Sequence, residues 1–122
     1  MKLLALSPIL WTKHLQLTVG YYTTVLGFTC EDMNEAIGWA SLVRDNVQIM
    51  IAVPSQHPDF KNPQMTGSVY IRTDNVEKIW AELKDKTDIC YPIDNFETGM
   101  REFAIYDNNR YIIQFGQEIE SE

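Results

Sequence analysis

The sequence is poor in cysteine and histidine, with two of each among 122 residues. Cys30 and Cys90 stand 60 positions apart and outside any metal-binding or redox motif, so we expect reduced, unreactive thiols. No apolar run approaches the roughly 20 residues that a membrane-spanning helix needs. The opening MKLLALSPIL lacks a small-residue cleavage site, which favours a first strand over a signal peptide. We therefore expect a cytoplasmic protein.

Basic residues are also scarce, since ten Lys and Arg stand against 17 Asp and Glu. The formal net charge is −7 and the pI is about 4.7, which argues against nucleic acid as a partner and is compatible with cationic ligands. Hydrophobic residues make up 45% and charged residues 22%, as in ordinary globular proteins. The length predicts a single domain, 1–122, large enough to bury a core.

Hydrophobic spacing predicts one helix in the first half of the chain. Its apolar stripe consists of Leu15, Val19, Tyr22 and Leu26. Gly27 is suited to end this helix in the left-handed conformation. Strands are predicted at 3–11, 28–32 and 37–53, the last one broken by a tight turn at Asp45-Asn46.

A proline-rich loop at 54–66 separates this half from a second half with the same order of elements. Its length predicts either a connector or a lid. A strand is expected at 68–73 and a helix at 74–86, whose apolar stripe consists of Val76, Ile79, Trp80 and Leu83. Asp74 is the expected N-cap, with Glu77 as its capping-box partner. Three further strands are predicted at 88–93, 101–106 and 111–116.

The two halves align with each other. Ser7, Thr12 and Leu15 match Ser68, Thr73 and Val76 at an offset of 61 positions. Val47 and Met50 match Tyr111 and Gln114 at an offset of 64. The sequence therefore predicts an internal repeat, with modules at about 3–53 and 67–117.

Side chains alternate between the two faces of a strand, so each predicted strand has an aliphatic face and a mixed face. The aliphatic face is expected to pack against the helices. The mixed face combines polar groups with aromatic and apolar ones, which is typical of a ligand cleft. A face packed against another subunit is the alternative. The mixed face carries the candidate ligand-binding residues Ser7, Trp11, Trp39, Ser41, Gln48, Met50, Ser68, Tyr70, Arg72, Glu102 and Gln114.

Two segments resemble a known family. YYTTVLGF is similar to the segment after the first strand in the vicinal oxygen chelate superfamily, which includes glyoxalase I, extradiol dioxygenases and bleomycin-resistance proteins. GMREFAIYDNNRYIIQFGQ resembles the closing hairpin of the bleomycin-resistance branch, although its turn at 107–110 lacks the proline and glycine of that branch. The resemblance implies an α+β fold of two paired βαβββ modules, which form a curved mixed sheet around a cleft. It also implies a homodimer.

Metal-dependent members of that superfamily hold the ion with four residues, typically His and Glu. The matching positions here are Ser7, Met50, Ser68 and Gln114. Hydroxyl, thioether and amide groups are poor ligands for a divalent first-row metal, so we expect no metal and no other cofactor. The two histidines, His14 and His57, are interpreted as surface residues.

Evidence for catalysis is thin. The chain has no Gly-rich phosphate loop and no Cys–His or Ser–His pair at a suggestive spacing. Glu102 is a weak candidate for a general base, and an ion pair with Arg72 or Arg101 is the simpler interpretation. The favoured hypothesis is a metal-independent small-molecule binder of the bleomycin-resistance type.

Such a binder would sequester or carry an aromatic compound. Trp11, Trp39 and Tyr70 would stack on the compound, and Glu102 with the acidic surface would favour a positive charge. Two alternatives stay open: a metal-independent lyase or isomerase, and a dimeric protein with no specific ligand.

Overall fold

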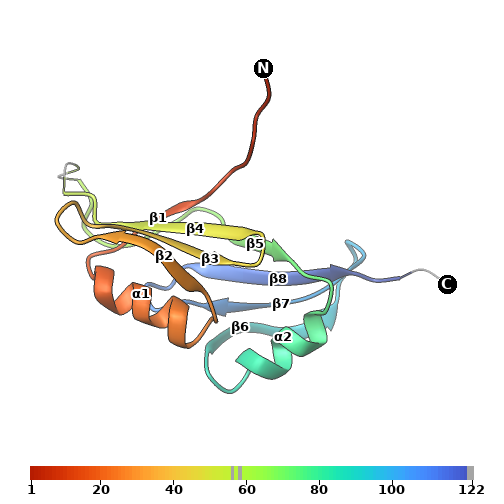
Figure 1. The fold of residues 1–122 in the computed structure, drawn as a ribbon. Helices are drawn as coiled ribbons and strands as arrows, with labels where there is room; N and C mark the ends of the chain where they lie inside the picture. Colours follow the sequence, from red (N-terminus) through yellow and green to blue (C-terminus); the bar gives the residue numbers. More distant parts are fainter. Residues whose placement is uncertain (56, 58, 121–122) are drawn as a thin grey trace. The chain divides into compact units, whose positions relative to one another are not determined.

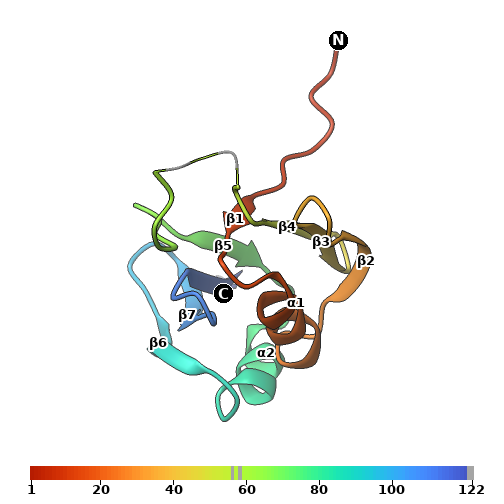
Figure 2. The same cartoon turned by 90° about the vertical axis from the view of Figure 1, so that its left-hand side faces the viewer.

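The computed structural model describes residues 1–55, 57 and 59–120, and the chain divides into two compact units, Met1–Pro63 and Gln64–Glu122. Each unit contains one four-stranded mixed sheet and one helix (Figures 1 and 2). The α+β class expected from the sequence is therefore confirmed. None of the helices in the described part of the chain has the length and apolarity that crossing a bilayer requires.

The first unit has the strand order β1-β4-β3-β2, in which β1 pairs with β4 in parallel and the other pairs are antiparallel. Its elements are β1 (Ile9–Trp11), α1 (Leu15–Thr24), β2 (Thr29–Asn34), β3 (Trp39–Arg44) and β4 (Val47–Ala52). Helix α1 packs against β2, β3 and β4, and Figure 2 shows it on one side of these strands. All four residues of the predicted stripe are buried.

The second unit repeats this arrangement with the order β5-β8-β7-β6, and again the first pair is parallel. Its elements are β5 (Val69–Arg72), α2 (Val76–Leu83), β6 (Asp88–Asn95), β7 (Met100–Tyr106) and β8 (Ile112–Glu118). Helix α2 packs against β7 and β8. Phe103, Ile105 and Ile113, on the helix-facing side, are fully buried.

Both helices begin in the same way. The Thr12 hydroxyl accepts the His14 N–H at 3.0 Å, and the Thr73 hydroxyl accepts the Asn75 N–H at 3.2 Å. The sheet also fixes both threonines. The Thr12 N–H donates to the carbonyl of Ala52 at the end of β4, and the Thr73 N–H donates to the carbonyl of Gly116, the matching residue in β8. The two turns from strand into helix therefore use the same chemistry at matching positions.

Helix α1 ends as the sequence predicts. Gly27 adopts a φ of +75°, and the Phe28 N–H reaches back to the Tyr22 carbonyl at 2.9 Å. The expected cap of α2, in contrast, is wrong. The N-cap is Asn75, whose side chain accepts the Lys78 N–H at 3.1 Å, and Asp74 lies one residue before it.

The first strand is shorter than predicted, since β1 covers only Ile9–Trp11. Parallel register pairs Ile9 with Met50, so residues before about position 6 would lie beyond the start of β4 and have no strand to pair with. Figure 1 shows this segment running away from the sheet, and Leu3, Leu4 and Leu6 are each at least 90% exposed. The apolar composition of the segment therefore predicted a strand that sheet geometry does not support.

Candidate functional site

On the side of the first sheet that faces away from α1, two tryptophans lie in one row. Strand register pairs Trp11 with Ala52 and Ala52 with Trp39. Neighbouring strands lie about 4.8 Å apart, so the two tryptophan backbones are separated by roughly 10 Å with one methyl group between them. Trp11 is 37% exposed and Trp39 is half-buried. The row therefore presents two indole rings on either side of a small residue.

The described part of the proline-rich loop adds aromatic rings to this row. The His57 ring lies 4.8 Å from the Trp11 ring, centroid to centroid, at an interplanar angle of 32°. The Phe60 ring meets Trp11 edge-on at 5.6 Å. The loop thus contacts the candidate face, and Trp11 belongs to an aromatic group of three.

A polar network occupies the next part of the same face. Ser7 donates to the Gln48 side-chain oxygen, and Gln48 donates to the Ser41 hydroxyl at 2.8 Å. Ser41, almost fully buried, donates to a Glu31 carboxylate oxygen at 2.7 Å, and Gln48 reaches the same oxygen at 3.3 Å. Met50 lies between Ile9 and Ser41 in the register. Three predicted polar residues therefore meet around a carboxylate that the sequence reasoning missed.

Glu31 lies in a β-bulge of the strand predicted at 28–32. Regular pairing between β2 and β3 is interrupted between Cys30 and Asp32, and Glu31 is the extra residue. A bulge breaks strict alternation, so face assignment by period two fails there. One of the two register shifts between β6 and β7 of the second unit lies at the matching place, between Ile89 and Tyr91.

In the second unit the matching row is charged instead of aromatic. Register pairs Arg72 with Gly116 and Gly116 with Glu102. Tyr70 is two residues before Arg72 on the same face of β5. Its side chain lies over Gly116, and its hydroxyl donates to Glu102 Oε1 at 3.0 Å. A Cβ atom at position 116 would lie 1.9 Å from the Tyr70 oxygen. Only glycine lets the tyrosine take this path to the carboxylate.

Two further neutral donors hold the Glu102 carboxylate. Tyr91 donates to Oε2, and the Gln114 amide nitrogen lies 3.4 Å from the same oxygen. Gln114 also donates to the Tyr91 oxygen at 2.8 Å and accepts the Ser68 hydroxyl. Glu102 is 8% exposed, so a buried carboxylate is held by hydroxyl and amide groups.

The ion pair expected for Glu102 is absent from residues 1–55, 57 and 59–120. Arg101 donates to Glu77 and, at 3.0 Å, to Asn95. Arg72 is exposed, and the structure pairs it with no acidic group among those residues. Tyr70 lies across Gly116, between Arg72 and Glu102, and its hydroxyl donates to one Glu102 oxygen.

Both tyrosines remain neutral hydrogen-bond donors at physiological pH. Burial, and then the hydrogen bond to Glu102, raise the pKa of Tyr70 to about 12. Burial also raises the pKa of Tyr91 to about 12, and Glu102 adds to this effect while the Gln114 hydrogen bond opposes it.

Among the cavities that the described residues form, two open ones each lie within a single unit. One, of about 440 Å³, is in the second unit and is lined by Tyr70, Arg72, Thr98, Met100 and Glu102. Its size falls in the range of small-molecule sites. It brings three predicted ligand-binding residues together.

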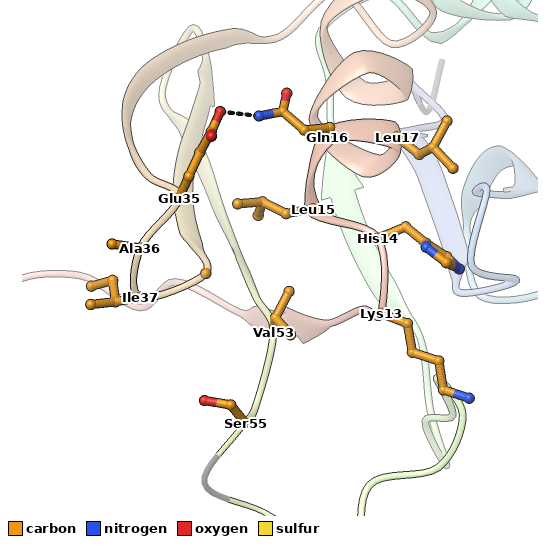
Figure 3. A pocket seen from close by; sticks show the side chains of 11 residues that line it. Lys13, His14, Leu15, Gln16, Leu17, Glu35, Ala36, Ile37, Val53 and Ser55 are labelled. Atoms are coloured by element: carbon orange, nitrogen blue, oxygen red, sulfur yellow. Dashed lines mark hydrogen bonds between the residues drawn. The ribbon is translucent and has the colours of Figure 1, made fainter.

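The other cavity, of about 490 Å³, lies between the start of α1 and the β2–β3 turn of the first unit (Figure 3). Leu15, Ala36 and Val53 form an aliphatic wall, and a hydrogen bond between Gln16 and Glu35 crosses one side. No residue predicted to bind ligand lines it. The lining mixes aliphatic side chains with polar and charged ones from the start of α1 and from the β2–β3 turn.

Four positions match the metal ligands of the superfamily that the sequence resembles, and their side chains do not suit a metal ion. They are Ser7, Met50, Ser68 and Gln114. The Gln114 amide already accepts Ser68 and donates to Tyr91, and Ser7 donates to Gln48. Met50 offers a thioether, which suits hard or borderline divalent ions poorly. Within the described residues no three His, Cys, Asp or Glu side chains are grouped so that they could hold an ion. Both cysteines are free thiols.

The fold and these faces define an α+β protein whose two units each present polar side chains on an open sheet surface. The family model of the Glyoxalase/Bleomycin resistance protein/Dioxygenase superfamily matches residues 4–115, and the chain belongs to this superfamily. The resemblance inferred from the sequence is therefore confirmed.

Solved structures share the fold at low sequence identity. The bleomycin-binding protein from Streptomyces verticillus, complexed with copper(II)-bleomycin, is 19% identical with a TM-score of 0.74, covering 94% of this chain and 96% of that one. TioX from Micromonospora sp. ML1 is 17% identical with a TM-score of 0.74, covering 92% and 96%. Lactoylglutathione lyase from Agrobacterium tumefaciens is 10% identical with a TM-score of 0.70, covering 93% and 92%. No curated protein has a significantly similar sequence.

Proposed function

We propose that this protein binds a planar aromatic small molecule with a positive charge, and that it sequesters or carries the molecule without a metal and without turnover. The row Trp11, Ala52, Trp39 carries the proposal. Two indoles flanking a methyl group offer a slot with aromatic walls, and stacking on such walls stabilises planar ligands by about 0.5–1.5 kcal/mol per ring pair.

The charge preference comes from Glu31. Its carboxylate is fixed on the same face by Ser41 and Gln48, close in register to the tryptophan row. An indole face attracts a cation as well, by about 0.5–2 kcal/mol. A cation that stacks on the row would therefore gain from both groups, and an anion from neither.

Binding without reaction is favoured by the state of Glu102, the residue proposed as a base in the enzyme alternative. Three neutral donors engage its oxygens. A substrate proton would have to compete with these donors for the carboxylate oxygens. The structural similarity to a bleomycin-binding protein also supports a binding function. The similarity to a lactoylglutathione lyase is the reason to keep an enzyme as the alternative. We further propose a cytoplasmic homodimer without a cofactor.

Quenching of tryptophan fluorescence tests the proposal. Metal-free bleomycin, copper(II)-bleomycin and a simple acridinium cation serve as probes, because together they vary size, metal and charge. Trp39→Ala should weaken binding about 5- to 30-fold, since it removes about 1–2 kcal/mol of stacking. Ala52→Leu should weaken binding similarly, because a larger side chain fills the slot while both indoles remain.

Trp80→Phe is the matched control, since Trp80 packs on Phe103 in the second unit and lies outside the row. Its affinity should equal that of the wild type. Equal affinity of the wild type, Trp39→Ala and Ala52→Leu for every probe would refute the aromatic slot. Conversion of a probe without added metal would favour the enzyme alternative.

A further inference from the structure

Opposite charges in the second unit line one cavity without pairing. Arg72 and Glu102 flank Gly116 in the register, and both line the cavity of about 440 Å³. Among residues 1–55, 57 and 59–120, the Arg72 guanidinium has neither a hydrogen-bond nor an ion-pair partner. Arg72 and Glu102 lie on strands β5 and β7, on either side of β8, so their backbones are roughly 10 Å apart.

Tyr70 lies between the two charged side chains. Its ring lies over Gly116, between the strands that carry the two charges, and its hydroxyl holds Glu102 Oε1. Tyr91, from β6, and Gln114, from β8, contact the other carboxylate oxygen. The carboxylate is thus oriented only by uncharged hydrogen-bond donors. The Arg72 guanidinium lines the same cavity and has no partner among the described residues. A buried charge without a counter-ion is costly, and such sites are frequently functional.

We propose that this cavity binds a small zwitterion of the α-amino-acid type. The ligand ammonium would donate to Glu102 Oε1 and to the Tyr70 oxygen, and the ligand carboxylate would accept from the Arg72 guanidinium. Guanidinium and carboxylate groups match each other in planar, bidentate geometry. Thr98 and Met100 complete the lining, so an unbranched aliphatic side chain fits beside the thioether.

This inference stands apart from the proposed function, because it uses no residue of the tryptophan row. A matched series of aliphatic probes avoids aromatic stacking altogether. L-norleucine carries both charges, pentylamine carries only the ammonium and hexanoate carries only the carboxylate. Each is titrated into ¹⁵N-labelled protein, and affinities are taken from amide shifts in β5 and β7. Failure of the aromatic slot would leave these titrations unchanged.

L-norleucine should bind about tenfold or more tightly than either single-charge analogue, since each lost contact is a hydrogen bond between charged groups. Arg72→Met should reduce the affinity for L-norleucine to that for pentylamine and leave pentylamine unaffected. Arg101→Met is the control, because Arg101 is already paired with Glu77, and it should change nothing.

Glu102→Gln should bring L-norleucine to the level of hexanoate. If that variant does not fold, the Arg72→Met result decides alone, since Arg72 is exposed and its loss leaves the core intact. Binding of all three probes with equal affinity, no shift with L-norleucine, or full affinity in Arg72→Met would each overturn the proposal.

Discussion

Replacement of Gly116 by alanine isolates the close approach on which the second unit's polar cluster depends. A Cβ atom at this position would lie 1.9 Å from the Tyr70 hydroxyl oxygen, 2.6 Å from Cζ and 3.0 Å from Cε1. Such distances are impossible, so the Tyr70 ring must move. Tyr70 is 38% exposed, so its ring can move toward solvent. Moving the ring costs less free energy than displacing the backbone. The variant therefore separates Tyr70 from Glu102.

The size of the effect follows from three contributions. A hydrogen bond to a charged acceptor contributes about 1.5–3 kcal/mol to stability. Water that enters the open cavity restores part of that loss at Glu102 Oε1. Alanine is also more favourable than glycine inside a strand by about 0.5–1 kcal/mol. The free energy of unfolding of Gly116→Ala should therefore fall by about 1 kcal/mol relative to wild type.

Urea unfolding and tyrosine absorbance titration measure the two consequences together. Stability should fall in Gly116→Ala, and the pKa of Tyr70 should return from about 12 toward its ordinary value of 10.0. In a Tyr70→Phe background, Gly116→Ala should cost less, because the hydroxyl contact is already gone. Gly67→Ala is the control, since nothing lies within 4 Å of its added Cβ. Wild-type stability with Tyr70 still titrating near 12 would refute the reasoning.

Two other predictions concern pH and helix capping. The folded-state pKa values of Tyr70 and Tyr91 are raised to about 12 from 10.0, so their contribution to stability is complete below pH 10 and is lost as the pH rises through 12. Urea unfolding across this window should therefore show a shallower decline for Glu102→Gln than for wild type, and parallel curves would contradict the assignment. Asn75→Ala should lower the unfolding free energy by about 1 kcal/mol, because it removes the cap of α2, whereas Asp74→Ala should have little effect. If the two variants lost the same unfolding free energy in thermal or urea unfolding, the assignment of the cap to Asn75 alone would be wrong.

Periodic features of the fold could be predicted because each signal is repeated along the chain. The stripe of α1 has four members, and all of them are buried. Gly27 adopts the left-handed conformation that its place after the stripe indicates. Single-residue features are less secure. Asp74 and Asn75 are both good N-cap residues, and only the backbone decides which side chain reaches the Lys78 N–H.

The candidate faces show a similar division. Alternation placed Trp11 with Trp39 and Tyr70 with Gln114 on common faces, and the strand register agrees with both pairs. Alternation is no guide to Glu31, because a bulge carries that carboxylate out of period. Nor could it find the path of Tyr70, since nothing in a glycine's own type says which neighbour uses its missing side chain.

The two rows suggest how one backbone plan can hold two chemistries. Position by position, Trp11 corresponds to Arg72, Ala52 to Gly116 and Trp39 to Glu102 in the strand registers of the two units. The central residue is small in both rows. In the first unit a methyl group leaves space between two indoles, and in the second the absence of even that methyl admits Tyr70. If the small central residue is what makes each surface usable, Ala52→Leu and Gly116→Ala should each impair only the surface of their own unit. Titrations with acridinium and with L-norleucine measure the two surfaces separately. If either variant lost binding of both probes, the independence of the two surfaces would be contradicted.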